Sequence, residues 1–468
     1  MVQTLVRWAT RVPTDRMLDP SCGDGRFLAA WRNSFGVERD SSAHAQARQR
    51  APWARIHEGE FFTWAATTKE RFECAAGNPP FIRYQTFAGP TRERALKLAA
   101  SLGAPFSALT SSWAPFLVAT ASLLKRGGRM AFVIPSEVGH APYAEPLLTF
   151  LASSFARVQL VAVREKVFPE LSEDVWLLFA DGYGDRTAEF EFTATDHLKF
   201  IATPPRPTSR VSDAEWRRWN RRLRPFLLPE SVRELYLETA ALKTTRRFGT
   251  LAKIGIGYVT GDNDFFHLRP SQAKAARIPR SLLRPTVRNG RALNGHPISD
   301  ATVRRWLEDD EQILLLHLTA RTAISDSLKK YLNSDAARAA QKTYKCRNRS
   351  PWYAVPDVKV PDAFLSYMSS EGPALVANHS GCVATNSVHT VNVTNDWSLS
   401  KLLLTWKDPF TRLSCEIEGH PLGGGALKVE PGEAVRVALI DKRKWSLPEQ
   451  HTIADGINTL RRWRHCRG

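Results

Sequence analysis

Cysteine is scarce in this sequence, and its spacing matches no familiar framework. The 468 residues include six cysteines, with no Cys-x-x-Cys pair and no Cys/His spacing typical of zinc. This excludes a disulfide-stapled secreted domain. It predicts reduced, structural thiols in a cytoplasmic protein that holds no metal.

Long apolar runs are also absent. The most apolar stretch, Trp113–Leu124, is too short to span a bilayer, and the first residues lack the apolar core of a signal peptide. No Pro-, Gly- or Ser-rich tract is long enough to predict a disordered tail. We therefore expect a soluble chain that is not exported and has no membrane partner.

Acidic residues are in the minority. The 47 Asp and Glu residues stand against 65 Lys and Arg, which gives a formal charge of +18. Such a surplus favours a polyanionic partner, because neutralising phosphates releases condensed counterions. A basic surface without selectivity explains the same balance, so the charge indicates nucleic acid only when it is joined to a site.

The length exceeds what one hydrophobic core usually organises, which predicts two domains. From Arg16 to Asp181, short strand-like runs alternate with helical stretches, a rhythm typical of a doubly wound α/β domain. We assign this domain to residues 1–205. Its predicted strands are 17–19, 35–38, 74–77, 129–134 and 175–179, and its predicted helices are 27–34, 91–101 and 113–125.

The sequence pattern changes in the second half of the chain. A Pro-rich passage, 203–207, precedes a charged helical segment that predicts a basic connection over 206–245. Beyond it, irregular strands alternate with Gly and Pro turns, and one long helix is predicted from Thr302 to about Lys330. An α+β domain is therefore expected over 246–468.

A Gly-bearing turn follows the first predicted strand. In the segment Asp19–Leu28, Gly23 and Gly25 would let a ligand approach the backbone, although a plain strand-to-helix turn produces the same pattern. Glu38 ends the second strand, where a carboxylate can accept from ribose hydroxyls. Glu60 follows the third, where it can accept from an adenine amine. Either carboxylate alone could equally be a solvated surface group.

The most specific motif is Asn78-Pro79-Pro80-Phe81, directly after the fourth predicted strand. Together with the Gly-bearing turn, it resembles the catalytic motif of the gamma-class N6-adenine DNA methyltransferases of restriction–modification systems. The resemblance implies a Rossmann-like class I methyltransferase domain, then a DNA target-recognition domain. It also implies S-adenosyl-L-methionine as cofactor and site-specific methylation of a flipped adenine in double-stranded DNA, within a restriction–modification or phage-defence system. The implied cofactor-binding residues are Asp19, Pro20, Cys22, Gly23, Gly25, Glu38, Glu60 and Asn78.

The chemistry of this reaction explains the residue types of the motif. The adenine amine is a poor nucleophile, so catalysis needs acceptors for its hydrogens, and the Asn78 amide oxygen and Pro79 carbonyl suit that role. The two prolines, Pro79 and Pro80, preorganise the loop. Phe81 would stack on the extruded base, and the resemblance assigns Phe168, in Val167-Phe168-Pro169, as its partner.

The C-terminal half carries a softer likeness to the recognition domains of these enzymes, over Gly255–Asp264 and Pro351–Tyr353. We expect Arg246, Arg247, Arg284 and Arg288 to contact DNA. The run Arg217–Arg224 would either line the same cleft or form a solvated helix face. A separate restriction endonuclease stays open as a further partner.

Three departures from the family pattern and two alternative functions remain. The family's Thr-Pro element ahead of the cofactor turn is missing, so either the natural chain extends further at its N-terminus or the pocket is open there. Phe81 replaces the commoner Tyr, and Glu60 replaces the commoner Asp. The alternatives are an Asn-Pro-Pro-Tyr-type methyltransferase of RNA or protein glutamine, and a catalytically inactive DNA-binding specificity subunit.

Overall fold

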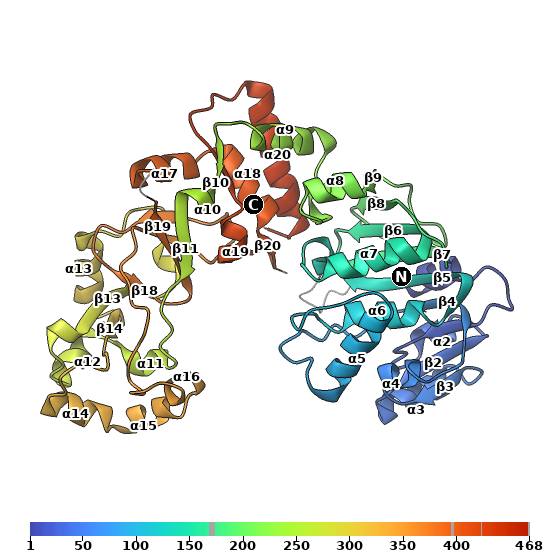
Figure 1. The fold of residues 1–468 in the computed structure, drawn as a ribbon, viewed down its shortest axis with the longest axis horizontal. Helices are drawn as coiled ribbons and strands as arrows, with labels where there is room; N and C mark the ends of the chain where they lie inside the picture. Colours follow the sequence, from blue (N-terminus) through green and yellow to red (C-terminus); the bar gives the residue numbers. More distant parts are fainter. Residues whose placement is uncertain (168–173, 395–396, 423, 467–468) are drawn as a thin grey trace. The chain divides into compact units, whose positions relative to one another are not determined.

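The computed structural model describes residues 1–167, 174–394, 397–422 and 424–466, and it divides into two compact units. The first unit is Met1–Leu227 and the second is Leu228–Gly468. Figure 1 shows the helices and strands of both units as a ribbon. In the described part of the chain, no helix is long and apolar enough to cross a membrane.

The first unit is built on one large sheet with the strand order β3-β2-β1-β4-β5-β7-β6-β8-β9. The strands from β3 to β5 run parallel, and β7 runs antiparallel between β5 and β6. This arrangement confirms the predicted Rossmann-like α/β domain. The strands are β1 Met17–Asp19, β2 Ser34–Glu38, β3 Arg55–Glu58, β4 Phe72–Gly77, β5 Leu124–Pro135, β6 Phe155–Val163, β7 Val175–Tyr183, β8 Glu189–Thr195 and β9 Ser209–Ser212.

Helices flank this sheet because its central strands are apolar on both faces, as buried parallel strands are. The strand order reverses between β1 and β4, and ligands of doubly wound folds bind at the carboxyl ends of such strands. The helices are α1 Val2–Ala9, α2 Arg26–Ala29, α3 Ser41–Arg50, α4 Phe61–Ala65, α5 Gly89–Ser101, α6 Trp113–Ala121, α7 Ala144–Ser154 and α8 Asp213–Arg218, with 3-10 turns η1 Ser136–Gly139 and η2 Arg224–Leu227.

The predicted connection over 206–245 is not a separate region. Its first part adds β9, α8 and η2 to the first unit, while helix α9, Glu230–Ala240, belongs to the second unit. The first part of the segment packs onto the first unit because it has an apolar side, which its many charged residues made hard to recognise in the sequence. Trp216 is buried edge-to-face against Phe190 at 5.3 Å between ring centroids, and Trp219 is buried too.

The Arg217–Arg224 run also belongs to the first unit, because several of its arginines have partners there. Arg217 pairs with Asp213 at 2.8 Å, and Arg221 pairs with Glu145 at 3.1 Å. Arg224 is buried. The run is therefore not simply a solvated helix face, and several of its arginines are already paired or buried within the first unit.

The second unit combines small sheets with short helices, which confirms the predicted α+β class. Its sheets have the orders β10-β22, β11-β19-β15-β17, β12-β14-β13-β18 and β16-β21-β20. The strands are β10 Thr245–Arg247, β11 Ala252–Ile256, β12 His267–Leu268, β13 Leu283–Val287, β14 Leu314–Leu316, β15 Ala363–Ser366, β16 Met368–Ser369, β17 Leu375–Ala377, β18 Val383–Ala384, β19 Val388–Val393, β20 His420–Pro421, β21 Leu427–Lys428 and β22 Ala438–Ile440.

Helices of very different length connect these sheets, from four residues in α10 to 17 in α20. They are α10 Phe248–Leu251, α11 Asn263–Phe266, α12 Pro270–Ala275, α13 Asp300–Glu308, α14 Asp326–Leu332, α15 Asp335–Gln341, α16 Tyr344–Arg347, α17 Leu399–Trp406, α18 Pro409–Glu418, α19 Pro431–Ala434 and α20 Leu447–Trp463, with 3-10 turns η3 Arg280–Leu282 and η4 Gly290–Ala292.

The long helix predicted from Thr302 to Lys330 is wrong. Helix α13 ends at Glu308, the buried run Leu314–Leu316 forms strand β14, and α14 begins only at Asp326. A short apolar run fits a buried helix and a buried strand equally well by pattern. Asp310, which follows α13, has φ of +51°, a left-handed conformation that does not continue a right-handed helix.

Candidate active site

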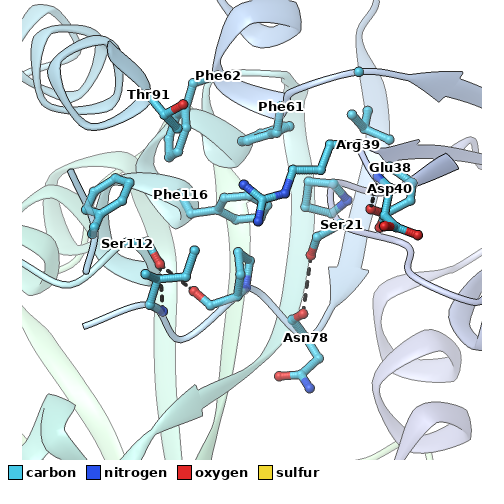
Figure 2. Close-up of a pocket in the computed structure, with 16 residues that line it drawn as sticks. Ser21, Glu38, Arg39, Asp40, Phe61, Phe62, Asn78, Thr91, Ser112 and Phe116 are labelled. Atoms are coloured by element: carbon cyan, nitrogen blue, oxygen red, sulfur yellow. Dashed lines mark hydrogen bonds between the residues drawn. The ribbon is translucent and has the colours of Figure 1, made fainter. Parts of the chain in front are cut away.

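A cavity of about 340 Å³ lies at the carboxyl ends of β1, β2, β3 and β4, beside the reversal of strand order (Figure 2). Its size falls in the range of small-molecule sites. Of the predicted cofactor residues, Pro20, Glu38 and Asn78 line it, whereas the others do not. The lining is Pro20, Ser21, Val37, Glu38, Arg39, Asp40, Gly59, Phe61, Phe62, Asn78, Pro80, Ile82, Phe87, Thr91, Ser112 and Phe116.

The turn after β1 needs both of its glycines, for different reasons. Gly25 caps α2 with φ of +84°, and a Cβ there would lie 2.9 Å from the Ala47 Cα of α3. Gly23 has φ of +51° and open space around it. Gly25 therefore allows a close helix approach, and Gly23 serves the backbone conformation. Cys22 lies behind the turn, its thiol buried against Gly36 of β2, and burial raises the pKa of that thiol.

Glu38 holds the turn and faces the cavity. Its Oε2 accepts from the Gly23 N–H at 2.9 Å, and its Oε1 accepts from the Asp40 N–H at 2.8 Å. An ionised carboxylate offers about four acceptor positions, so two remain for a ligand. The predicted contact with ribose hydroxyls fits this geometry, and the anchoring of Gly23 is a second role that the sequence did not indicate.

Asp19 ends β1 as a buried carboxyl group. Its Oδ1 accepts from the Ser21 N–H at 3.3 Å, while Oδ2 is buried without a hydrogen-bond partner among the described residues. Burial raises the pKa of Asp19 to about 8, the Ser21 N–H lowers it in part, and the charge of Glu38 raises it further. A buried acid beside Glu38 suits a ligand that carries positive charge.

Glu60 is not among the cavity-lining residues, so the geometry does not favour the predicted contact with an adenine amine. It is the N-cap of α4, where its carboxylate accepts from the backbone N–H groups of Phe62 and Thr63 at 3.0 and 2.9 Å. The Thr63 hydroxyl donates to it as well, at 2.8 Å. The first N–H groups of a helix have no partner within the helix, and an acidic residue before the helix can accept from them. Glu60 has this capping role in the structure.

Asn78 follows β4 directly and presents a free acceptor. Its backbone oxygen accepts from the Ser21 hydroxyl at 3.2 Å. The side-chain oxygen Oδ1 is buried without a partner among the described residues. Figure 2 shows this amide on the side of the loop away from Ser21. A buried acceptor left unpaired is costly, so it indicates a ligand that donates to it.

Ser112, which sequence reasoning missed, clamps the loop after Asn78. Its hydroxyl donates to the Pro80 carbonyl at 2.5 Å and accepts from the Ile82 N–H at 3.0 Å. Its own N–H donates to the Ile82 carbonyl at 2.9 Å. Its place before α6 reads as a helix cap in the sequence, yet its side chain makes no cap hydrogen bond.

Phe81 points away from the cavity that its neighbours line. Pro80 and Ile82 line the cavity, and Phe81 between them packs against the apolar cluster that includes Leu5 and Val6 of α1. Its predicted stacking partner, Phe168, lies outside the described residues.

Aromatic side chains that the sequence did not single out form one wall of the cavity. Phe61 and Phe62 of α4 and Phe116 of α6 all line it, with Phe61 and Phe116 at 4.3 Å between ring centroids. Flat apolar rings of this kind suit a planar heterocycle. The sequence signal for them was only an apolar pattern, which a plain core would give too.

The four arginines expected to contact DNA lie in the second unit on two different sheets. Arg246 and Arg247 are on β10, and Arg247 donates to the Arg436 carbonyl at 2.8 Å. Arg284 is exposed on β13, and Arg288 follows that strand. The four arginines therefore come from two separate strand pairings of this unit, and their contact with DNA stays a prediction.

The comparisons with known proteins agree with this architecture. The family model of the Type II methyltransferase M.Eco57I C-terminal domain matches residues 220–463. The chain is 19% identical to Type II methyltransferase M.AccI of Acinetobacter calcoaceticus, over 85% of this chain and 74% of that protein. It is 28% identical to a tRNA1(Val) (adenine(37)-N6)-methyltransferase of Actinobacillus succinogenes, over 28% of this chain and 58% of that protein.

A solved structure shares the fold. The chain superposes with a TM-score of 0.52 and 12% identity on the Type IIL restriction-modification enzyme MmeI in complex with DNA, covering 95% of this chain and 62% of that one. The chain thus spans less than two thirds of that enzyme's chain. By the match to its C-terminal half, this chain belongs to the M.Eco57I family of Type II methyltransferases and is a DNA methyltransferase of the restriction–modification class.

Proposed function

We propose that this chain uses S-adenosyl-L-methionine to methylate the exocyclic N6 amine of an adenine that is flipped out of duplex DNA at a specific sequence. The observation that carries the proposal is the Asn78 amide oxygen, which is buried and unpaired among the described residues beside the cavity. This oxygen can accept a hydrogen bond from a ligand, and an exocyclic amine can donate one.

The residues around the cavity fit this cofactor. Glu38 would hold the ribose hydroxyls, the aromatic wall of Phe61 and Phe116 would hold the adenine ring, and Asp19 would compensate the positive charge. When bound, the cofactor supplies an electrophilic methyl group on a sulfonium.

The Asn78 amide oxygen would accept a hydrogen bond from one N–H of the target amine, and the Pro79 carbonyl would accept one from the other N–H. Both acceptors draw the amine nitrogen toward tetrahedral geometry, which frees its lone pair for attack. Ser112 keeps the Pro80–Ile82 segment in place, so these acceptors need not be ordered during the reaction.

The second unit would position and read the DNA, since it contains most of the region that matches the M.Eco57I C-terminal domain. Phosphate contacts would set the register, and base contacts would select the sequence. A second candidate is an adenine in RNA, which the likeness to the tRNA enzyme favours. That likeness covers 28% of the chain, so it concerns the chemistry more than the substrate.

The test is to incubate the purified chain with plasmid DNA, total tRNA and labelled S-adenosyl-L-methionine in parallel, followed by base-resolved sequencing of methylated DNA. We expect label in DNA only, on adenines of one sequence motif, and a far lower initial rate of labelling with Asn78→Ala. Label on cytosines or in tRNA would contradict the proposal.

A further inference from the structure

The second unit has a hollow of about 490 Å³ at one end of the sheet β12-β14-β13-β18. Strand β14 pairs antiparallel with both β12 and β13. The residues after β12 and β13 therefore meet those before β14. Arg269 and Arg288 come from the first two places, and Gln312 comes from the third.

Three arginines and one glutamate give this hollow an excess of positive charge. Arg269, Arg288 and Arg291 line it, and in the described part of the chain none of them takes part in an ion pair. Glu311 lines it as well, is exposed and is likewise unpaired within the described residues. Both signs of charge are thus available to a ligand.

Arg288 is held in a defined orientation. Its Nη1 donates to the Gln312 Oε1 at 2.6 Å, and the Gln312 amide in turn donates to the His267 carbonyl at 2.7 Å. Nη2 has no partner among the described residues. A guanidinium fixed through one nitrogen keeps its remaining N–H groups ready for a ligand, at little cost in side-chain entropy.

The support beneath Arg288 is a buried polar network. The Tyr258 hydroxyl lies 2.7 Å from both the His267 Nε2 and the Thr286 hydroxyl, and the Thr385 hydroxyl donates to the Arg288 carbonyl at 2.6 Å. Burial, aided by the charge of Arg288, lowers the pKa of His267 to about 4. His267 is thus neutral near pH 7, and the network stays fixed as the pH varies around that value.

The mixture of donors and acceptors decides between two DNA ligands. A phosphate offers only acceptors, so the Glu311 carboxylate would oppose it. A G·C base pair offers guanine O6 and N7 as acceptors for arginine, and the cytosine N4 amine as a donor for a carboxylate. We propose that Arg288 and Glu311 read one G·C pair of the methylation site, an inference that rests on the proposed function.

The experiment measures kcat/KM on duplexes that carry each of the four base pairs at every position of the wild-type motif. We expect Arg288→Ala to lose discrimination at one G·C position by roughly 10- to 100-fold, while other positions stay selective. Glu311→Ala should relax the same position. Arg304→Ala, on the exposed side of α13 and outside the hollow, is the matched charge control and should leave the discrimination unchanged.

Each remaining outcome decides the matter too. Equal weakening on all duplexes, with a salt slope smaller by about 0.9, would make Arg288 a phosphate contact and overturn the inference. A wild-type motif without a G·C pair would overturn it while leaving the proposed function intact. Absence of DNA methylation by the wild type would overturn both. If Arg288→Ala fails to fold, Arg288→Lys, which keeps the charge but loses the planar fork, together with Glu311→Ala, provides the same readout.

Discussion

Replacing Asp19 by Asn removes a buried ionisable group from the end of β1 and nearly preserves its shape. In the folded protein the pKa of this carboxyl is raised from 3.8 to about 8 by burial. Between these values the folded protein retains a proton that the unfolded chain releases, so stability falls as the pH rises through this window. Below pH 3.8 the carboxyl is protonated in both states and does not lower the stability of the fold. Above pH 8 the loss of stability has reached its full value.

The size of the effect follows from the pKa shift. Each pH unit between the two values costs about 1.4 kcal/mol, which amounts to about 4 kcal/mol at pH 7 for the protein without cofactor. Asn carries no charge, and its amide leaves one buried polar group without a partner, at about 1–3 kcal/mol that does not vary with pH. The free energy of unfolding of the variant, relative to that of the wild type, should therefore increase as the pH increases.

Calorimetric unfolding of both proteins without cofactor at pH 5, 7 and 9 measures this difference. We expect the free energy of unfolding of Asp19→Asn, relative to wild type, to increase by several kcal/mol from pH 5 to pH 9. Parallel pH profiles would show that the Asp19 carboxyl is ionised or solvated in the folded protein, and would refute the reasoning.

The same group should link cofactor binding to proton release. A positively charged ligand lowers the pKa of a nearby carboxyl, so binding at pH 7 should release a proton from wild type and none from Asp19→Asn. Titration calorimetry in buffers of different ionisation enthalpy measures this release directly.

Three further variants test the rest of the site. Asn78→Ala should slow single-turnover methylation by about 10²–10³ with DNA binding retained, and a rate constant above about half the wild-type value would contradict its role. Glu38→Ala should weaken cofactor binding by roughly 10- to 100-fold, because an ionised acceptor is lost, and calorimetry showing equal affinity would place the cofactor elsewhere. Ser112→Ala leaves the Ile82 N–H without its acceptor, so the methylation rate at saturating cofactor should fall while Ser112→Thr restores it. An unchanged rate would mean that the loop is held without Ser112.

Local pattern alone predicted that the candidate residues gather at one edge of one sheet, and Pro20, Glu38 and Asn78 line the same cavity there. Glu38 and Asn78 were expected at strand ends because the short apolar runs before them are bounded by turn residues and alternate with helical stretches, as in an α/β domain. Carboxyl ends of neighbouring parallel strands meet at one edge, so the residues that follow them gather there. The motifs after β1, β2 and β4 therefore indicated the site without tertiary information.

Tertiary contacts decided which groups face the cavity and which support it. Glu60 could cap α4 or face a ligand, and only the path of the chain showed that it caps. Ser112 clamps a loop some 30 residues away in sequence, and Arg288 is held by Gln312 from a neighbouring strand end. Such contacts depend on which strands pair, and no local periodicity encodes that pairing, so composition and spacing supplied the candidates and packing assigned their roles.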